Sequence, residues 1–299
     1  MTVCVWAIIL HYRLWRETLR CAQSLLEGDY PNLHILLVDN GSNNGSAEEL
    51  RLRLGDRVEL LALPGNRFYA GGMNAGLTWA LGRGADWLLA MNNDTFVAPD
   101  MVSLLVEAAH TRPDVGIVAP VIYYAADPQR IWSAGARRRR MWPFAQELAR
   151  QGQLWEPDAG PLAVDYVTGC AMLLRCEALQ AAGLFDPRYR MYYEDVDLCE
   201  RVRQAGYQIL TAPGARMWHL VGRTAGEEPA LNRYHHTRNR WRFYMVHTQG
   251  LVRFWAGLLL LMQEGARCAG FMVRGRFGLA RAQWAALRDA LLNTENGPI

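Results

Sequence analysis

One short stretch constrains the fold of this chain more than any other, because an apolar run of strand length ends abruptly in polar side chains. Trp87 to Met91 is continuously apolar, and Asn92 to Thr95 follow it. Such a run is typical of a strand buried on both faces of a parallel sheet. In open α/β sheets ligands bind at the carboxyl ends of these strands. The stretch predicts either a site for a hard cation and its anion, or a turn in which Asp94 or Thr95 caps a helix starting near Pro99.

Strands and helices alternate through the first 119 residues. Apolar strands are predicted at 3–10, 34–38 and 58–63, with helices at 15–26, from a capping box at Ser46 to Glu49, and at 72–81. This alternation predicts βαβ units and a Rossmann-like, mainly parallel sheet flanked by helices. Several strands end in polar residues, namely His11 and Tyr12, Asp39, and the stretch after Met91, so these residues should meet at one sheet edge. We interpret residues 1–119 as a nucleotide-binding half.

The rest of the chain changes character twice. Residues 120–165 mix aromatic residues, Pro, Gly and arginines with poor periodicity, which indicates an irregular insertion of loops and short strands over the sheet. A strand at 167–174 and a helix at 177–182 follow, and we interpret residues 120–235 as an acceptor and catalytic half. Beyond Arg233 the pattern is helical to about residue 292. The expected fold is therefore an α/β domain over residues 1–235 with a C-terminal helical region at 236–299.

Composition argues against several classes of protein. Lys and Arg total 32 against 29 for Asp and Glu, and a net charge of +3 gives no reason to expect a nucleic-acid partner. The six cysteines form no C-x-x-C pair and no zinc spacing, so we expect reduced thiols in a cytoplasmic protein. No basic segment precedes the first apolar run, which argues against a signal peptide. The late apolar run Phe254 to Met262 is too short for a transmembrane helix.

Asp195 lies in the first turn of a helix predicted to run to about residue 205. It precedes Leu198 and Cys199 by three and four residues, so it extends their apolar stripe and should point inward. An inward carboxylate suits a general base, which must reach a substrate hydroxyl group. The neighbouring acids Glu194 and Asp197 are expected to complement the helix dipole instead.

Two further stretches carry polar residues suited to ligands. Asn66 to Gly76 is a glycine-containing loop that runs into a helix N-terminus, where phosphate binds readily, but it lacks a P-loop or dinucleotide fingerprint. Trp218 and His219 follow a predicted strand near 208–211. The histidine is either a hydrogen-bonded structural residue or a metal ligand.

Together these stretches resemble the inverting family-2 glycosyltransferases with the GT-A fold, and most closely the bacterial rhamnosyltransferase-like branch. The resemblance covers roughly residues 3–245. It rests on seven stretches in the family's order and spacing: Val38-Asp39-Asn40-Gly41-Ser42, the loop at 66–76, Asn92-Asn93-Asp94-Thr95, Gly169-Cys170-Ala171-Met172-Leu173, Gly183-Leu184-Phe185-Asp186, Tyr192-Tyr193-Glu194-Asp195-Val196-Asp197-Leu198 and Trp218-His219.

The resemblance implies roles for individual residues. Asp195 matches the catalytic base. Asp94 matches the last acid of the D-x-D metal motif, and His219 matches a histidine that completes the metal shell in some relatives, so Mg²⁺ or Mn²⁺ is the implied cofactor. Asn92 stands where many members carry Asp, and tight metal binding without nucleotide is not expected. The implied nucleotide and donor residues are Tyr12, Asp39, Asn66, Gly72, Asn74, Asn92 and Asn93, and the implied acceptor-side residues are Trp132, Tyr193, Glu194 and Arg238.

The implied reaction is an inverting transfer of a sugar, with rhamnose favoured, from a dTDP-, UDP- or GDP-linked donor. The implied acceptor is a hydroxyl group of a glycan or lipid-linked molecule in cell-envelope polysaccharide synthesis. Two alternatives remain open. One is a sugar nucleotidyltransferase, and the other is a non-catalytic carbohydrate- or nucleotide-binding protein on the same fold.

Two groups of basic residues each have two possible interpretations. Arg137 to Arg140, beside Trp142, either bind an acidic acceptor such as a lipid-linked diphosphate or form a solvated loop. The arginine-bearing helices after Tyr234 either lie on the anionic inner face of the cytoplasmic membrane, or pack as a bundle on the sheet or a partner subunit. The sequence does not indicate an oligomeric state.

Overall fold

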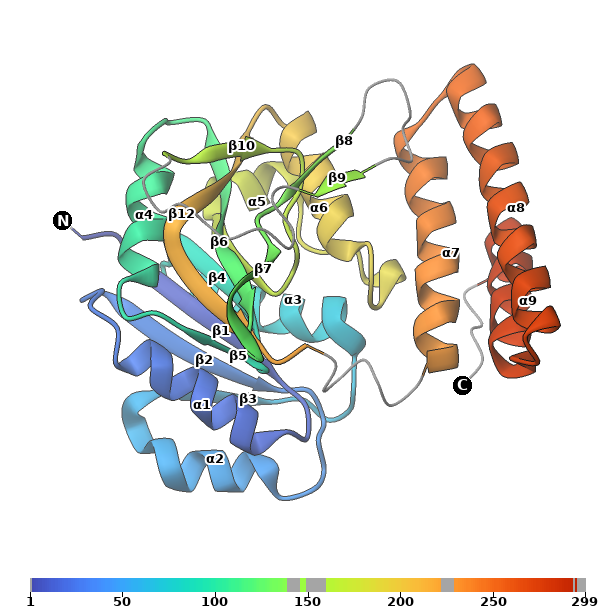
Figure 1. The fold of residues 1–299 in the computed structure, drawn as a ribbon. Helices are drawn as coiled ribbons and strands as arrows, with labels where there is room; N and C mark the ends of the chain where they lie inside the picture. The colour runs from blue at the N-terminus through green and yellow to red at the C-terminus, as the bar shows by residue number, and fades with distance from the viewer. Residues whose placement is uncertain (1, 139–145, 149–159, 222–228, 293, 295–299) are drawn as a thin grey trace. The chain divides into compact units, whose positions relative to one another are not determined.

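The computed structural model describes residues 2–138, 146–148, 160–221, 229–292 and 294. The chain forms two compact units. The first unit comprises Met1–Asp186 and Asp195–Val221, and the second comprises Pro187–Glu194 and Gly222–Ile299. The first contains the sheet, and the second contains long C-terminal helices (Figure 1). The C-terminal unit thus begins before the predicted boundary at residue 236.

A ten-stranded sheet forms the centre of the first unit. Its main path runs β10 (Leu162–Val164), β12 (Gln208–His219), β6 (Val115–Tyr124), β11 (Ala171–Arg175), β4 (Trp87–Asn92), β1 (Val5–His11), β2 (Leu33–Asp39), β3 (Glu59–Ala62). Strand β5 (Thr95–Val97) pairs with β12, and β7 (Asp127–Ser133) pairs with β6. Strands β4, β1, β2 and β3 are parallel, as predicted, whereas β11 runs antiparallel between β4 and β6.

Helices cover both faces of this sheet, which explains why its central strands are continuously apolar. Alternate residues of β1 enter different clusters: Val5, Ala7 and Ile9 pack with α1 (Trp15–Leu26), α2 (Ser46–Leu54) and α4 (Met101–His110). Trp6, Ile8 and Leu10 pack with α3 (Phe68–Leu81), α5 (Cys176–Ala182) and α6 (Glu194–Gln204). Successive side chains along a strand point to opposite faces of the sheet. Since helices cover both of these faces, the residues of β1 on each face are apolar.

Two helix starts differ from the sequence-based predictions. Helix α2 is capped by Gly45 in the left-handed region, with no side-chain cap, because the Ser46 hydroxyl instead bonds His11 Nε2 at 2.8 Å. The predicted capping box is therefore wrong. Helix α3 begins at Phe68, four residues before the predicted start, so Gly72 lies inside the helix.

The region after residue 120 is also more regular than predicted. Strand β6 continues to Tyr124 and β7 pairs with it, while β8 (Ala136–Arg138) and β9 (Gln146–Leu148) form a separate ribbon. These short strands agree with the expectation of an insertion that contains short strands, and they pair more regularly than the weak periodicity indicated. Tyr123 and Ile131 of this region lie in one buried cluster.

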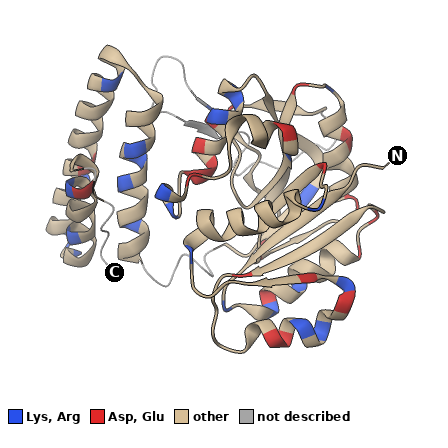
Figure 2. Ribbon diagram, turned by 180° about the vertical axis from the view of Figure 1, so that it is seen from behind, with Lys and Arg blue, Asp and Glu red and all other residues tan. Residues whose placement is uncertain are grey.

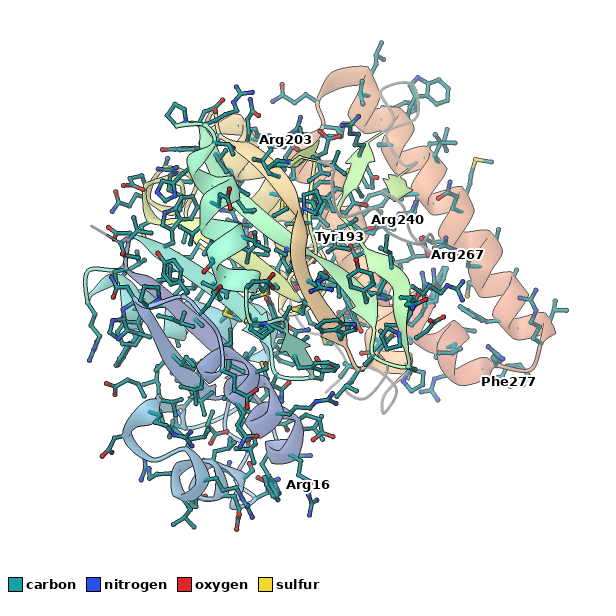
Figure 3. All side chains as sticks on the ribbon, turned by 60° about the vertical axis from the view of Figure 1, so that its left-hand side comes forward. Arg16, Tyr193, Arg203, Arg240, Arg267 and Phe277 are labelled. Atoms are coloured by element: carbon teal, nitrogen blue, oxygen red, sulfur yellow. The ribbon has the colours of Figure 1, made fainter. Side chains whose placement is uncertain are left out.

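The C-terminal unit contains α7 (Pro229–His247), α8 (Gly250–Val273) and α9 (Phe277–Leu291), as the helical pattern predicted. Glu264 of α8 is buried and accepts ion pairs from Arg233 at 2.8 Å and from Arg240 and Arg267 at 2.9 Å. Figure 3 labels two of these arginines, Arg240 and Arg267. Gln283 of α9 also donates to Glu264, so one carboxylate joins all three helices. Within the described ranges, no helix is both long enough and apolar enough to cross a bilayer.

His235 and His236 of α7 give this unit a predicted acid sensitivity. Burial lowers the pKa of both imidazoles to about 4, with Arg238 adding to the effect on His235 and Arg233 on His236. In the unfolded chain each pKa returns to about 6.5, so between about pH 6.5 and pH 4 the unfolded state binds more protons. The melting temperature should therefore fall as pH is lowered through this window.

Thermal melts followed by circular dichroism test this prediction. The double variant His235→Gln/His236→Gln should lose part of the fall, while the exposed His34→Gln should keep it. An identical pH dependence in the wild type and the double variant would contradict the assignment.

Candidate functional site

Asp94 and His219 meet within the first unit. Asp94 follows β4, and His219 ends β12, which pairs with β5 through His219 and Thr95. His219 Nε2 lies 3.3 Å from Asp94 Oδ1, and the residues are 8% and 4% exposed. Burial lowers the pKa of His219, but Cys170 and Asp94 outweigh it and raise that pKa to about 10. A buried imidazole and carboxylate thus form one polar pair.

Cys170, Asn92 and Trp132 lie next to the histidine of this pair or to one another. Cys170 Sγ lies 3.9 Å from His219 Nδ1, and Asn92 Nδ2 lies 3.5 Å from the same sulfur. Trp132 of β7 packs edge-on against the His219 ring, with ring centroids 4.8 Å apart. Trp132 therefore contacts His219 directly, whereas Asn92, assigned to the other side of the reaction, reaches it only through Cys170.

Asp195 is held by backbone N–H groups. Its Oδ2 accepts from Gly169 N–H at 2.9 Å and its Oδ1 accepts from Val196 N–H at 2.8 Å. Burial raises the pKa of Asp195, and these N–H groups oppose the rise. Leu198 and Cys199 on the same helix are fully buried, in keeping with the predicted inward stripe. The dipeptide 169–170 therefore links Asp195 on one side to the histidine pair on the other.

Gly169 and Tyr69 complete this arrangement, and sequence reasoning assigned neither of them a role. Tyr69 Oη donates to Gly169 O at 2.7 Å. A Cβ at Gly169 would lie 2.9 Å from Tyr69 Oη and 3.5 Å from Asp195 Cβ. Both residues fall within the family-like stretches, but their proximity depends on the antiparallel strand β11, which no local pattern predicts.

A second network joins two predicted nucleotide-binding segments. Asp39 ends β2 and accepts from Ser42 N–H at 3.1 Å. The Asn40 amide donates to Asn66 Oδ1 at 3.1 Å and accepts from Arg67 N–H at 2.9 Å. These contacts place Asp39 and Asn66 on neighbouring turns at the carboxyl edge of the parallel strands, where ligands of such sheets bind.

The other predicted donor residues have structural contacts. A Cβ on Gly72 would lie 2.7 Å from Leu10 Cδ1, so Gly72 lets α3 approach β1 closely. Asn74 donates to Phe185 O at 2.7 Å and accepts from Phe185 N–H at 3.1 Å. Asn93 donates to Thr18 Oγ1 at 2.9 Å, and the Arg13 guanidinium lies over the Tyr12 ring. Their roles in nucleotide binding stay predictions.

Tyr193, Glu194 and Arg238 belong to the C-terminal unit, which holds the segment 187–194 in a strained conformation. Tyr192 and Tyr193 have φ of 66° and 71°, a region costly for residues other than glycine. Asn239 Nδ2 donates to the carbonyl groups of Tyr189, Met191 and Tyr192 at 2.6–2.9 Å. Arg238 Nη1 donates to Arg188 O at 3.2 Å, and the Tyr193 ring (Figure 3) packs against His236. Asn239, which sequence reasoning missed, is the anchor of this segment.

Asp197 makes a contact that the sequence-based prediction does not include. Asp197 is only 2% exposed and pairs with Arg201 at 2.8 Å, so the expectation that it only complements the helix dipole is wrong. Arg201 in turn donates to carbonyl groups at 182–184 and anchors that turn.

Arg137 donates to Ala163 O at 2.9 Å, while Arg139, Arg140 and Trp142 lie outside the described residues.

Once His219 has released the proton that its raised pKa favours, its imidazole nitrogen and the Asp94 carboxylate suit a divalent cation that shares its coordination with a ligand. No group of three or more His, Cys, Asp or Glu residues arranged for a metal occurs in the described part of the chain. Mg²⁺ is often bound through one or two carboxylates together with substrate phosphates, and Mn²⁺ accepts both carboxylate and imidazole. The pair therefore fits a metal whose remaining ligands come from a diphosphate and water.

Gly169→Ala tests the packing around Asp195. The added methyl group should clash with Tyr69 Oη and destabilise the fold by about 1–3 kcal/mol, the usual cost of overpacking. Because Tyr69→Phe removes the nearest atom, the alanine should cost less in that background. Denaturant unfolding of the two single variants and the double variant measures this coupling. Strictly additive effects would show that Gly169 and Tyr69 do not oppose each other.

Residues 6–182, more than half of the chain, match the family model described as glycosyl transferase family 2. The N-acetylglucosaminyl-diphospho-decaprenol L-rhamnosyltransferase of Mycobacterium tuberculosis is 29% identical over 242 residues, which cover 73% of this chain and 76% of that protein. The galactofuranosyltransferase GlfT1 of Mycolicibacterium smegmatis is 28% identical over 295 residues, covering 96% of each chain.

Two solved structures have similar folds. The mannosyltransferase PcManGT from Pyrobaculum calidifontis, in complex with GDP-Man and Mn²⁺, has a TM-score of 0.61 at 15% identity, covering 98% of this chain and 88% of that one. GalNAc-T7 with UDP, GalNAc and Mn²⁺ has a TM-score of 0.63 at 17% identity, covering 82% of this chain and 48% of that one. At 15% and 17% identity, these two similarities show a shared fold alone.

Proposed function

Because the chain belongs to glycosyltransferase family 2 and is a glycosyltransferase of the rhamnosyltransferase-like branch with the GT-A fold, we propose that it transfers a sugar to a lipid-linked glycan acceptor in cell-envelope polysaccharide synthesis. The donor is a nucleoside-diphosphate sugar, with dTDP-rhamnose first and UDP- or GDP-linked sugars next. The name of the mycobacterial relative, a rhamnosyltransferase acting on a diphospho-decaprenol, supports this choice.

The observation that carries the proposal is the position of Asp195. Its carboxylate is held by Gly169 N–H, and the next residue, Cys170, contacts His219 of the Asp94 pair. Asp195 accepts the proton of the acceptor hydroxyl group, and the oxygen attacks the anomeric carbon as the bond to the nucleoside diphosphate breaks. A single displacement inverts the anomeric configuration.

The remaining residues of the first unit bind and orient the donor. Asp39 and Asn66, joined through Asn40, would bind the nucleoside, and Asn92 would contact the donor phosphates. Asp94 and His219 would hold a divalent cation, Mg²⁺ or Mn²⁺, which when bound neutralises the leaving diphosphate as a Lewis acid. Trp132, packed on His219, would restrict water near the reacting groups.

The two alternatives are less well supported. A binding protein has no need of a carboxylate with a raised pKa, whereas a base is effective when its pKa lies closer to the working pH. A sugar nucleotidyltransferase would require a segment rich in glycine and basic residues near the first strand. Residues 11–13, which follow that strand, are instead His, Tyr and Arg.

We further propose that the C-terminal unit lies on the inner face of the cytoplasmic membrane. Helix α8 exposes Leu251, Phe254, Trp255 and Met262, of which Phe254 and Trp255 are 63% and 56% exposed. Arginines far outnumber acids on α7 to α9, as Figure 2 shows. Interfacial helices combine such an apolar face with basic residues that attract anionic lipids.

Replacing Asp195 tests the assignment of the base. Asp195→Asn should lower kcat by a factor of roughly 10²–10⁴, the usual contribution of a general base. The thermal shift produced by dTDP, UDP or GDP with Mn²⁺ should remain, since the donor is bound elsewhere. Near-normal turnover in this variant would remove Asp195 from the mechanism.

The raised pKa of Asp195 predicts the acid limb of the pH profile. Transfer needs the carboxylate, so activity should rise with pH around a pKa above the usual aspartate range of about 3.9. Measuring kcat from pH 4 to pH 8 locates this limb. Activity that is already maximal at pH 4 would show that Asp195 does not titrate in the working range.

A further inference from the structure

His11 is fully buried at the carboxyl end of β1, and the reaction described above gives it no role. Its Nδ1 lies 2.7 Å from Thr18 Oγ1 of α1, and its Nε2 lies 2.8 Å from Ser46 Oγ of α2. It pairs with Asp39 of the neighbouring strand, and its carbonyl group accepts from Asn40 N–H at 2.9 Å. One buried imidazole therefore joins both helices beside the turn to which the proposed function assigns the nucleoside.

The hydrogen bonds of Thr18 determine which nitrogen of the His11 ring carries the proton. The Thr18 hydroxyl donates its single proton to Leu14 O at 2.9 Å and accepts from Asn93 Nδ2 at 2.9 Å. The contact with His11 Nδ1 therefore requires an N–H group on the ring. In the neutral ring Nε2 is then the acceptor, and Ser46 Oγ donates to it. Burial lowers the pKa of His11, in keeping with a neutral ring.

On the α1 side this network ends beside Asp94. Asn93, which donates to Thr18, is 7% exposed and immediately precedes Asp94 in the chain. The carbonyl group of Asn92 accepts from Thr95 Oγ1 at 2.8 Å, so the same turn is also closed from within. The Thr18 contact thus fixes the side chain next to the proposed cation ligand.

On the α2 side the network continues to Asp39. Ser46 N–H donates to Asn44 Oδ1 at 3.2 Å, and Asn44 Nδ2 donates to Arg13 O at 3.4 Å. Arg13 N–H donates to Ser42 Oγ at 2.9 Å, and Ser42 N–H donates to Asp39 Oδ1 at 3.1 Å. A continuous chain of hydrogen-bonded residues therefore leads from the Asp39 carboxylate to the buried imidazole.

Two residues along this chain have an uncommon backbone conformation. Arg13 has a φ of 63° and Asn43 has a φ of 49°. Positive φ is uncommon for residues other than glycine, and it persists at ligand-binding turns where the surrounding contacts impose it. The N–H and carbonyl groups of Arg13 are both held, by Ser42 and Asn44. The conformation of this edge of the sheet is therefore specified by the network and not by the local sequence.

We propose that His11 is a positioning residue for donor binding, which holds the turn carrying Asp39 and the side chain of Asn93 in one fixed arrangement. The two ends of a nucleoside diphosphate then meet binding groups that are already in register. The inference rests on the proposed function for the identity of the ligand, whereas the bridge between the two turns rests on hydrogen bonds within the first unit. His11 acts through Ser46 and Thr18 and contacts no reacting atom.

Thr18→Val tests this role by calorimetric titration of the full chain with dTDP, UDP and GDP, each with Mn²⁺. Valine keeps the shape but removes the acceptor of Asn93 and His11. The nucleotide Kd should rise roughly three- to tenfold, the usual effect of one lost buried hydrogen bond. Thr18→Ser, which keeps the hydroxyl group, should bind almost as the wild type does. In transfer assays Thr18→Val should raise the KM for the donor sugar and leave kcat and the KM for the acceptor nearly unchanged.

Thr211→Val is the matched control. Thr211 is as fully buried as Thr18, and its hydroxyl group donates to Ala134 O at 3.0 Å, outside this network. Its valine variant should lower the melting temperature but leave the nucleotide Kd unchanged. A Kd that changes equally in both valine variants, or in neither, would show that the Thr18 hydroxyl is only structural and would overturn the proposal.

The contribution of His11 itself is measured without any ligand. Ser46→Ala and Thr18→Val remove partners from the two nitrogens of one ring, so their effects on denaturant unfolding should be non-additive. In a His11→Leu background this coupling should disappear. Additive effects in the presence of His11 would contradict the bridge.

Failure of this inference and failure of the proposed function give different results. Nucleotide binding that is normal in the wild type and unchanged in Thr18→Val rejects the role of His11 alone. A wild type that binds none of the three nucleotides rejects the donor site, and with it both proposals.

Discussion

The hydrogen bond from Gly169 N–H to Asp195 organises the candidate site. It sets the direction of the carboxylate, and through Cys170 the same turn contacts His219 and Asn92. Tyr69 fixes the turn from the other side by bonding Gly169 O. A Cβ at this position would lie 2.9 Å from Tyr69 Oη, so a larger residue would have to displace the Tyr69 side chain. The proposed base and the proposed cation-binding pair are therefore connected through this one turn, without sharing a helix or strand.

Much of the fold can be predicted from the sequence, because burial on both faces of the sheet leaves a strong local signal. The apolar β1 and β4 and the stripe that turns Asp195 inward are read from periodicity alone. The capping box at Ser46 fails because a distant residue, His11, binds the hydroxyl. Competition from tertiary contacts of this kind leaves no local pattern.

Apart from Asp195 on its helix, the site is predictable where its residues follow strands. Asp39 and Asp94 do so, and their position at the sheet edge follows from parallel topology. Gly169 and Cys170 do not, since they reach the site through the antiparallel insertion of β11 between β4 and β6. Tyr69, near the start of α3, meets them only through this long-range arrangement. Asn239 is further still in sequence, 47 to 50 residues from the carbonyl groups it holds. Its amide compensates for the strain at Tyr192 and Tyr193, as expected where function requires a costly backbone conformation.

Sugar transfer by direct displacement is tested most directly by the anomeric configuration of the product. The purified chain would be incubated with dTDP-β-L-rhamnose, or the UDP- or GDP-sugar that gives the largest thermal shift, and with a diphosphopolyprenyl-linked acceptor. Proton NMR of the product then reports the new linkage. Inverted configuration is the predicted result, formed by the wild type and not by Asp195→Asn. Retained configuration, or equal product from that variant, would contradict a single displacement driven by Asp195.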